Sequence, residues 1–177
     1  MSTLNKTIQW IAIAIFTTTF MTFSVSAQDL TDPEIASIAV TANSIDVDYG
    51  KIALKKSSTP AVKKFAQAMI DDHNSIIQQA VDLANKLGVT PKDNAVTQEL
   101  LQGSKEMTAN LNSKKGKAFD KAYIDNEVSY HEAVISTVKN VLIPQSTNKE
   151  LKALLVKVTP LLDAHLEMAK QAQAGLK

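Results

Sequence analysis

Three histidines, His73, His131 and His165, each lie near the middle of a stretch in which apolar residues recur at helical spacing. An α-helix turns about 100° per residue, so the apolar neighbours show on a helical wheel which way each imidazole points. His73 lies within roughly 20° of the middle of its apolar face, and the other two lie inside theirs. Histidine is a common metal ligand, so three inward histidines at matching heights indicate a shared site.

Carboxylates accompany these histidines. Glu127 precedes His131 by four residues, so the two side chains stack on one face, inside the apolar arc of their helix. A buried, unpaired glutamate is costly, and a cation or a histidine partner would relieve that cost. Asp46 and Asp48 flank the apolar stripe of the first predicted helix by about 80°, so either could turn inward from an edge. Asp72 is placed similarly on the second helix.

The heights of these residues predict one polar layer. His73, His131, His165, Glu127 and Asp46 each lie within a few residues of a helix midpoint, and midpoints meet in an antiparallel bundle. Three imidazoles with a carboxylate suit one transition metal ion, namely zinc, iron, manganese or copper. An alternative is a hydrogen-bonded layer that fixes helix register and holds no metal. A third interpretation is that the histidines do not converge.

Two methionines bear on the choice of metal. Met69 lies one turn before His73, and Met168 lies three residues after His165. A thioether combined with imidazole would favour copper. Methionine at helical spacing is, however, more often a core residue.

Signatures of catalysis are weak. The sequence has no cysteine, so it offers no thiolate nucleophile, no thiolate metal site and no disulfide. It has no Gly-rich phosphate loop and no serine in a strained elbow. Ser129 precedes His131, but the two lie on different helix faces. We therefore do not expect an enzyme of these classes.

The N-terminal 27 residues have the pattern of a secretory signal peptide. Lys6 gives a weakly positive start, and residues 8–23 are apolar, rich in threonine and uncharged. Small or tolerated residues precede Gln28, so we expect cleavage between Ala27 and Gln28. The protein would then be periplasmic or secreted, with no membrane span. The alternative is an uncleaved membrane anchor.

Charge and length describe the remaining domain, residues 28–177. Without the leader the 177-residue chain is 150 residues long, which suits one domain, and it carries 18 lysines against 18 acidic residues. No basic tract indicates a nucleic-acid partner. Because the sequence has no arginine, bidentate clamping of phosphate or carboxylate is not available.

Apolar periodicity and turn residues predict four long helices. They are expected over residues 34–57, 60–87, 117–142 and 148–174. The polar segment 90–116 is predicted to be a long crossover containing a short helical piece at 97–111. The third helix is expected to stop before Pro144, and a kink is expected at 158–160 because of Pro160. Short, long and short connections predict an all-α, ferritin-like four-helix bundle.

Several stretches resemble the secreted bacterial proteins grouped as domain-of-unknown-function family 4142. They are residues 48–54, 62–73, 83–89, 123–128 with His131, and 161–169. The resemblance covers about residues 38–172, nearly the whole mature domain. It implies a ferritin-like bundle located outside the cytoplasm, and members are often labelled outer membrane proteins. It implies no established activity.

The sequence departs from the di-iron pattern of ferritin-like proteins. That pattern uses Glu-x-x-His on two helices and a glutamate on each of the other two. Here Ile70 lies three residues before His73, and Leu162 lies three before His165. We therefore expect a mononuclear site rather than di-iron chemistry.

Two functional hypotheses of different classes follow. In the first, the midplane histidines and carboxylates bind a transition metal for storage, buffering or redox protection. In the second, the protein is a non-catalytic envelope stress or interaction module whose polar layer is purely structural. The first requires ligand atoms that converge within metal distance. The second requires side chains already satisfied by one another, and an exposed apolar patch for a partner.

Overall fold

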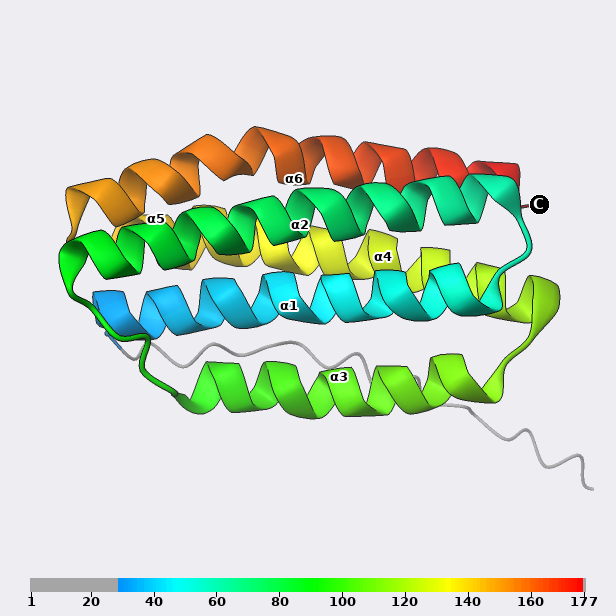
Figure 1. The fold of residues 1–177 in the computed structure, drawn as a ribbon, viewed down its shortest axis with the longest axis horizontal. Helices are drawn as coiled ribbons and strands as arrows, with labels where there is room; N and C mark the ends of the chain where they lie inside the picture. Colours follow the sequence, from blue (N-terminus) through cyan, green and yellow to red (C-terminus); the bar gives the residue numbers. More distant parts are fainter. Residues whose placement is uncertain (1–28, 177) are drawn as a thin grey trace, which may run out of the picture.

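Long helices arranged lengthwise make up the protein in a computed structural model, which describes residues 29–176 (Figure 1). The helices are α1 (Asp32–Lys56), α2 (Pro60–Leu87), α3 (Ala95–Ser113), α4 (Gly116–Thr137), the π-helix η1 (Val138–Leu142), α5 (Ile143–Gln145) and α6 (Lys149–Gly175). No strand occurs in this part of the chain. The predicted all-α bundle is therefore confirmed. The predicted signal peptide and its cleavage site lie outside the described residues.

Four helices, α1, α2, α4 and α6, form the bundle. Following the colours in Figure 1, α1 and α6 run in one direction, and α2 and α4 run in the other. Helix α1 packs on α2, α4 packs on α6, and α2 packs on α6. The connection from α2 to α4 therefore has to travel the length of the bundle, as the long predicted crossover requires.

The crossover is more helical than expected. Helix α3 fills Ala95–Ser113, where a shorter piece at 97–111 was predicted, because Asn94 caps its first turn by accepting a hydrogen bond from the Thr97 N–H at 3.0 Å. The helix lies along α1. At its far end, Nζ of Lys56 donates to the main-chain oxygen of Leu111 at 2.7 Å.

The ends of the first two helices follow their capping residues. Helix α1 starts at Asp32, two residues before the predicted start, where the main-chain N–H of Thr31 donates to Oε2 of Glu34 at 2.9 Å. Helix α2 has the predicted bounds, Pro60–Leu87. Gly88 ends it with a φ of 65°, a left-handed conformation that glycine adopts without steric cost.

The prediction that the third bundle helix stops before Pro144 was wrong. Helix α4 passes into η1 and then α5, so the helical path continues through Pro144 to Gln145. In η1 the ladder shifts by one residue, and the N–H of Ile143 bonds to the oxygen of Val138. This wider turn absorbs a proline, which has no N–H to contribute to an α-type ladder.

Helix α6 also contains a proline, at position 160, and it continues through it. Figure 1 shows α6 arched along its length. Thr159 lies beside the proline, and its hydroxyl donates to the main-chain oxygen of Leu155 at 2.8 Å. The helix therefore adapts to the proline without ending, and its C-terminal half still carries His165 into the bundle.

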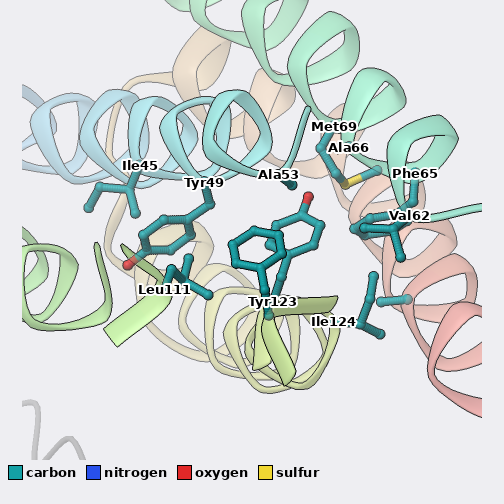
Figure 2. Close-up of a cluster of buried hydrophobic side chains, with 12 residues drawn as sticks. Ile45, Tyr49, Ala53, Val62, Phe65, Ala66, Met69, Leu111, Tyr123 and Ile124 are labelled. Carbon is teal, nitrogen blue, oxygen red and sulfur yellow. The ribbon is translucent and has the colours of Figure 1, made fainter. Parts of the chain in front are cut away.

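The core consists of two apolar clusters. The first includes Tyr49, Phe65, Met69 and Tyr123 (Figure 2). The second gathers at the other end of the bundle, and its buried members are Leu30, Ile35, Ile38, Ile76, Ile135, Val138, Leu142, Leu151, Leu155, Val158 and Leu162. On α2, α4 and α6 the residues predicted to form the polar layer fall between these two clusters, and on α1 Asp46 lies at the edge of the first cluster, next to Ile45.

A close contact between α1 and α2 depends on Gly50. A Cβ atom at this position would lie 2.8 Å from Cγ1 of Ile70 and 3.0 Å from the main-chain oxygen of Ala66. We expect Gly50→Ala to lower the free energy of unfolding by about 1–3 kcal/mol, because the two helices must separate. Urea unfolding measures the change.

A matched control is Gly103→Ala in the middle of α3, where an added Cβ meets nothing within 4 Å. It should raise the free energy of unfolding by about 0.5–1 kcal/mol, because alanine is the better helix former. Equal stability of the Gly50→Ala variant and the wild type would contradict the close approach.

Among residues 29–176, no helix has the length and apolar character needed to cross a membrane.

Candidate metal centre

Four helices each place a polar side chain in the middle of the bundle. Asp46 comes from α1, His73 from α2, Glu127 and His131 from α4, and His165 from α6, and none of the five is more than 3% exposed. Apolar residues one turn away on either side keep these faces inward. The five residues predicted from the sequence therefore lie in one buried layer.

The three imidazoles surround a common centre. Their ring centroids are 5.7 Å apart for His73 and His131, 5.0 Å for His73 and His165, and 5.5 Å for His131 and His165. One ring nitrogen from each histidine lies within 4.8 Å of the other two. Donors around a tetrahedral ion with bonds near 2.1 Å lie about 3.4 Å apart, so the three nitrogens would need to approach one another by no more than about 1.4 Å.

Each imidazole has one nitrogen held by an acceptor outside this centre. Nδ1 of His73 lies 2.7 Å from Oδ1 of Asn43. Nδ1 of His131 lies 2.9 Å from the main-chain oxygen of Glu127, and Nε2 of His165 lies 2.9 Å from Oδ2 of Asp72. Because all three partners are oxygen acceptors, these nitrogens donate, and the network thereby fixes the tautomers.

The remaining nitrogen of each ring carries a lone pair. These atoms are Nε2 of His73, Nε2 of His131 and Nδ1 of His165, and all three are buried without a hydrogen-bond partner. An outer acceptor that orients a histidine and leaves its other nitrogen free is the arrangement that metal-binding histidines show. The layer therefore presents three imidazole nitrogens prepared to accept a cation.

Two carboxyl groups complete the layer. Oδ2 of Asp46 lies 3.2 Å from Nε2 of His73 and 3.4 Å from Nε2 of His131, without the geometry of a hydrogen bond. Both carboxyl oxygens of Glu127 are buried and also unpartnered. Ligand atoms of Asp46, Glu127 and His131 lie within 4.8 Å of one another, so His131 belongs to both groups of donors.

The buried surroundings shift the pKa values of these groups in different directions. Burial, and to a lesser degree the charge of Asp46, raises the pKa of Glu127 well above its usual value. Burial is the largest single influence on Asp46 and opposes its ionisation, but the combined effects of His73, His131 and His165 outweigh it, so the pKa of Asp46 is lowered. Burial is also the main cause that lowers the pKa values of His131 and His165. Metal ligation requires neutral imidazole, and burial favours that form.

A purely structural polar layer would have its side chains satisfied by one another. Seven buried side-chain atoms of this layer lack a hydrogen-bond partner, namely both carboxyl oxygens of Asp46 and of Glu127 and the three free imidazole nitrogens. Buried polar groups in folded proteins are normally paired, and each exception calls for an explanation. A cation bound among them would satisfy most of these atoms at once.

Other residues considered from the sequence lie outside the layer. Asp48 is exposed and pairs with Lys51 at 3.0 Å. Asp72 contacts the layer only through its carboxylate, which lies 2.9 Å from Nε2 of His165. Met69 lies in the first apolar cluster, and Met168 packs against that cluster, so the structure gives both methionines packing roles.

Sequence reasoning did not single out Asn43. Its Nδ2 donates to the main-chain oxygen of Ala39 at 2.7 Å, which fixes Oδ1 toward His73. Asn43 lies three residues before Asp46, so the two share one side of α1. That spacing was the available signal, but it does not show that the amide reaches an imidazole.

A solved structure shares this fold. The structure described as "CopM in the Cu(II)-bound form" matches with a TM-score of 0.63 and 16% sequence identity, over 85% of this chain and 100% of that chain. At this identity the likeness concerns the fold alone. No curated protein matches the sequence.

Family membership rests on the sequence itself. The stretches singled out above from α1, α2, α4 and α6 contain four of the five residues of the polar layer. The fifth, Asp46, lies two residues before the first stretch. The family match extends over residues 21–172, more than four-fifths of the chain. The chain belongs to the family described as domain of unknown function DUF4142.

Proposed function

We propose that this protein binds one transition metal ion at the polar layer, through His73, His131 and His165 with Asp46, and with Glu127 beside them. The observation that carries the proposal is the set of three imidazoles, each tied to an outer acceptor by one nitrogen and free at the other. The ion would cross-link all four helices of the bundle.

Copper(II) is the metal we propose first. Nitrogen and oxygen donors without thiolate suit copper, zinc, iron and manganese alike by ligand type. Among divalent ions of this series, such sites bind copper most tightly. The similar fold of a protein solved in a Cu(II)-bound form supports the same choice.

The burial of the site favours storage or buffering of the ion over catalysis. A catalytic metal site keeps a coordination position open to substrate or water. Here all five residues are at most 3% exposed. A bound ion would therefore be shielded from reactants, which also suits protection against unwanted redox chemistry.

Copper titration of the purified protein tests the proposal. Electron paramagnetic resonance of the Cu(II) complex should show one binding site per chain with splitting from imidazole nitrogens. Parallel titrations with Zn(II), Mn(II) and Fe(II) rank the metals. Weak binding of several copper ions, with a spectrum unchanged in the His73→Leu variant, would show that copper binds at the surface and would refute the site.

We further propose that the domain acts outside the cytoplasm, after removal of residues 1–27. The support is the uncharged apolar run at 8–23 and the small residues before Gln28. Mass spectrometry of the exported protein should show a chain that begins at Gln28. A full-length chain retained in the membrane would instead support the anchor interpretation.

A further inference from the structure

A cavity of about 320 Å³ lies beside the polar layer, on the side of the second apolar cluster. It begins one turn away from the candidate metal ligands. Ile76 follows His73 by three residues, and Leu162 precedes His165 by three, and both line the cavity. The cavity is therefore separate from the layer and shares only its boundary.

The cavity is long rather than round. Its lining on α1 extends from Asn43 to Asp32, and on α2 from Ile76 to Leu87. Each stretch contains 12 residues, so its ends lie about 16 Å apart along the helix axis. Since α1 and α2 are antiparallel, the two stretches run together from the polar layer to the end of the bundle. The small side chains of alanines such as Ala39 and Ala80 line the cavity and leave its volume unfilled.

The uncharged polar side chains on the wall already form hydrogen bonds within the protein. Asn43 bonds to His73 and to the main chain, and the hydroxyl of Tyr130 donates to the main-chain oxygen of Ala42 at 2.9 Å. The hydroxyl of Thr137 donates to the main-chain oxygen of Ala133 at 2.9 Å. The wall therefore favours hydrocarbon over a hydrogen-bonding ligand.

The charge of the lining limits the head group. It includes two carboxylates, Asp32 and Glu99, and no lysine. Asp32 accepts hydrogen bonds from the N–H groups of Thr147 and Asn148, both at 2.9 Å, so it is fixed at that end. An anionic head group would lie near these carboxylates without a cation to pair with.

We propose that this cavity binds the hydrocarbon chain of a neutral lipid-like molecule, such as an aliphatic alcohol or ester, and discriminates against fatty acids. An engineered apolar cavity of about 150 Å³ is known to take up benzene, so apolar space of this kind is sufficient for binding. The length of the cavity suits a chain. The proposal does not depend on metal binding.

A neutral fluorescent probe, N-phenyl-1-naphthylamine, tests the proposal on the purified wild-type protein in EDTA. Its fluorescence should rise saturably with one site per chain. Dodecanol should displace it, and dodecanoate at the same concentration should displace at least tenfold less. Absence of saturable binding, or equal displacement by the two competitors, would overturn the proposal.

Cavity-filling variants locate the binding. Ala80→Phe and Ala39→Phe should each weaken probe binding at least tenfold, whereas Ala164→Phe, on the exposed face of α6, should leave it unchanged. Circular dichroism checks that each variant is folded. If both filling variants unfold, the preference of the wild-type protein for dodecanol over dodecanoate still tests the proposal. Equal loss in the Ala164→Phe variant would place the probe elsewhere and refute the cavity.

Discussion

Wild-type protein with Cu(II) at about 1,000 times its dissociation constant should melt about 8–16 °C above the metal-free protein at neutral pH. Binding to the native state alone stabilises it by about 4.1 kcal/mol at that concentration. Each kcal/mol shifts the melting temperature of a domain of this size by about 2–4 °C. Differential scanning calorimetry at fixed protein concentration measures the shift.

The His73→Leu variant should lose most of this shift. Removing a ligand should weaken binding at least about 100-fold, since loss of an outer-shell partner alone costs about 10–100-fold. At the same copper concentration the stabilisation then falls to about 1.4 kcal/mol, or about 3–6 °C. Asp48→Asn is the matched control, because Asp48 is exposed beside the site and pairs with Lys51. An unchanged shift in His73→Leu would refute the site.

Acid should remove the copper-induced shift. Protons compete with the metal for imidazole, so the shift is complete above the pKa values of the ligands and is lost as the pH falls through them. Burial lowers the pKa values of His131 and His165 from their usual 6.5. The shift should therefore persist below the pH of about 6.5 at which a free imidazole titrates, and fade at lower pH.

Replacing Glu127 by leucine should stabilise the metal-free protein and weaken copper binding. Both carboxyl oxygens of Glu127 are buried without a hydrogen-bond partner. Apolar replacement of a whole buried ion pair is often neutral or stabilising by about 1–4 kcal/mol, and Glu127 leaves no hydrogen-bonded partner behind, so we expect a gain within the same range. Urea unfolding in EDTA measures the gain.

The gain should depend on pH in a defined direction. The folded-state pKa of Glu127 is raised above 4.5. Glu127 therefore contributes most to stability below about pH 4.5, where it is protonated in both the folded and the unfolded state. This contribution is lost as the pH rises through the folded-state pKa, because a buried charge must then form. The advantage of Glu127→Leu over the wild type should therefore grow from about pH 4.5 upward.

Glu132→Leu is the matched control for this variant. Glu132 lies on the same helix and is exposed, with an oxygen 3.5 Å from Nζ of Lys170. Its replacement should change the free energy of unfolding by no more than about 0.5 kcal/mol. If Glu127→Leu instead lowers stability at every pH, the carboxyl group is a structural partner, and the metal-free polar layer is the better account.

Much of the fold follows from local signals in the sequence. Capping residues and Gly88 gave the bounds of α2, and apolar periodicity gave the inward faces of the four bundle helices. The common layer followed because His73, His131 and His165 lie near helix midpoints. Local signals failed at Pro144, because a shift to π-type bonding lets the chain pass a proline that an α-type ladder would exclude.

The positions on the helical wheel did not separate Asp46, which was predicted to join the layer, from Asp48. Both flank the apolar stripe of α1 at similar angles, and only the placement of the neighbouring helices decides which flank is covered. Asp46 is fully buried, whereas Asp48 is exposed. The hydrogen bond from His73 to Asn43 depends on side-chain rotamers, and the cavity depends on how alanines of several helices meet. Both features involve more than one helix, so apolar periodicity within a single helix does not predict them.

The burial of the polar layer has a kinetic consequence. With every candidate ligand side chain at most 3% exposed, an ion would have no direct route from solvent to the imidazole nitrogens. Entry and escape must pass through a transiently opened bundle, so the exchange rate cannot exceed the rate of that opening. Gly50 holds α1 against α2 at one side of the layer, and loosening this contact should speed exchange even where affinity changes little. The residence time of a bound ion would thus depend on how often the bundle opens, and not on the strength of the coordinate bonds alone.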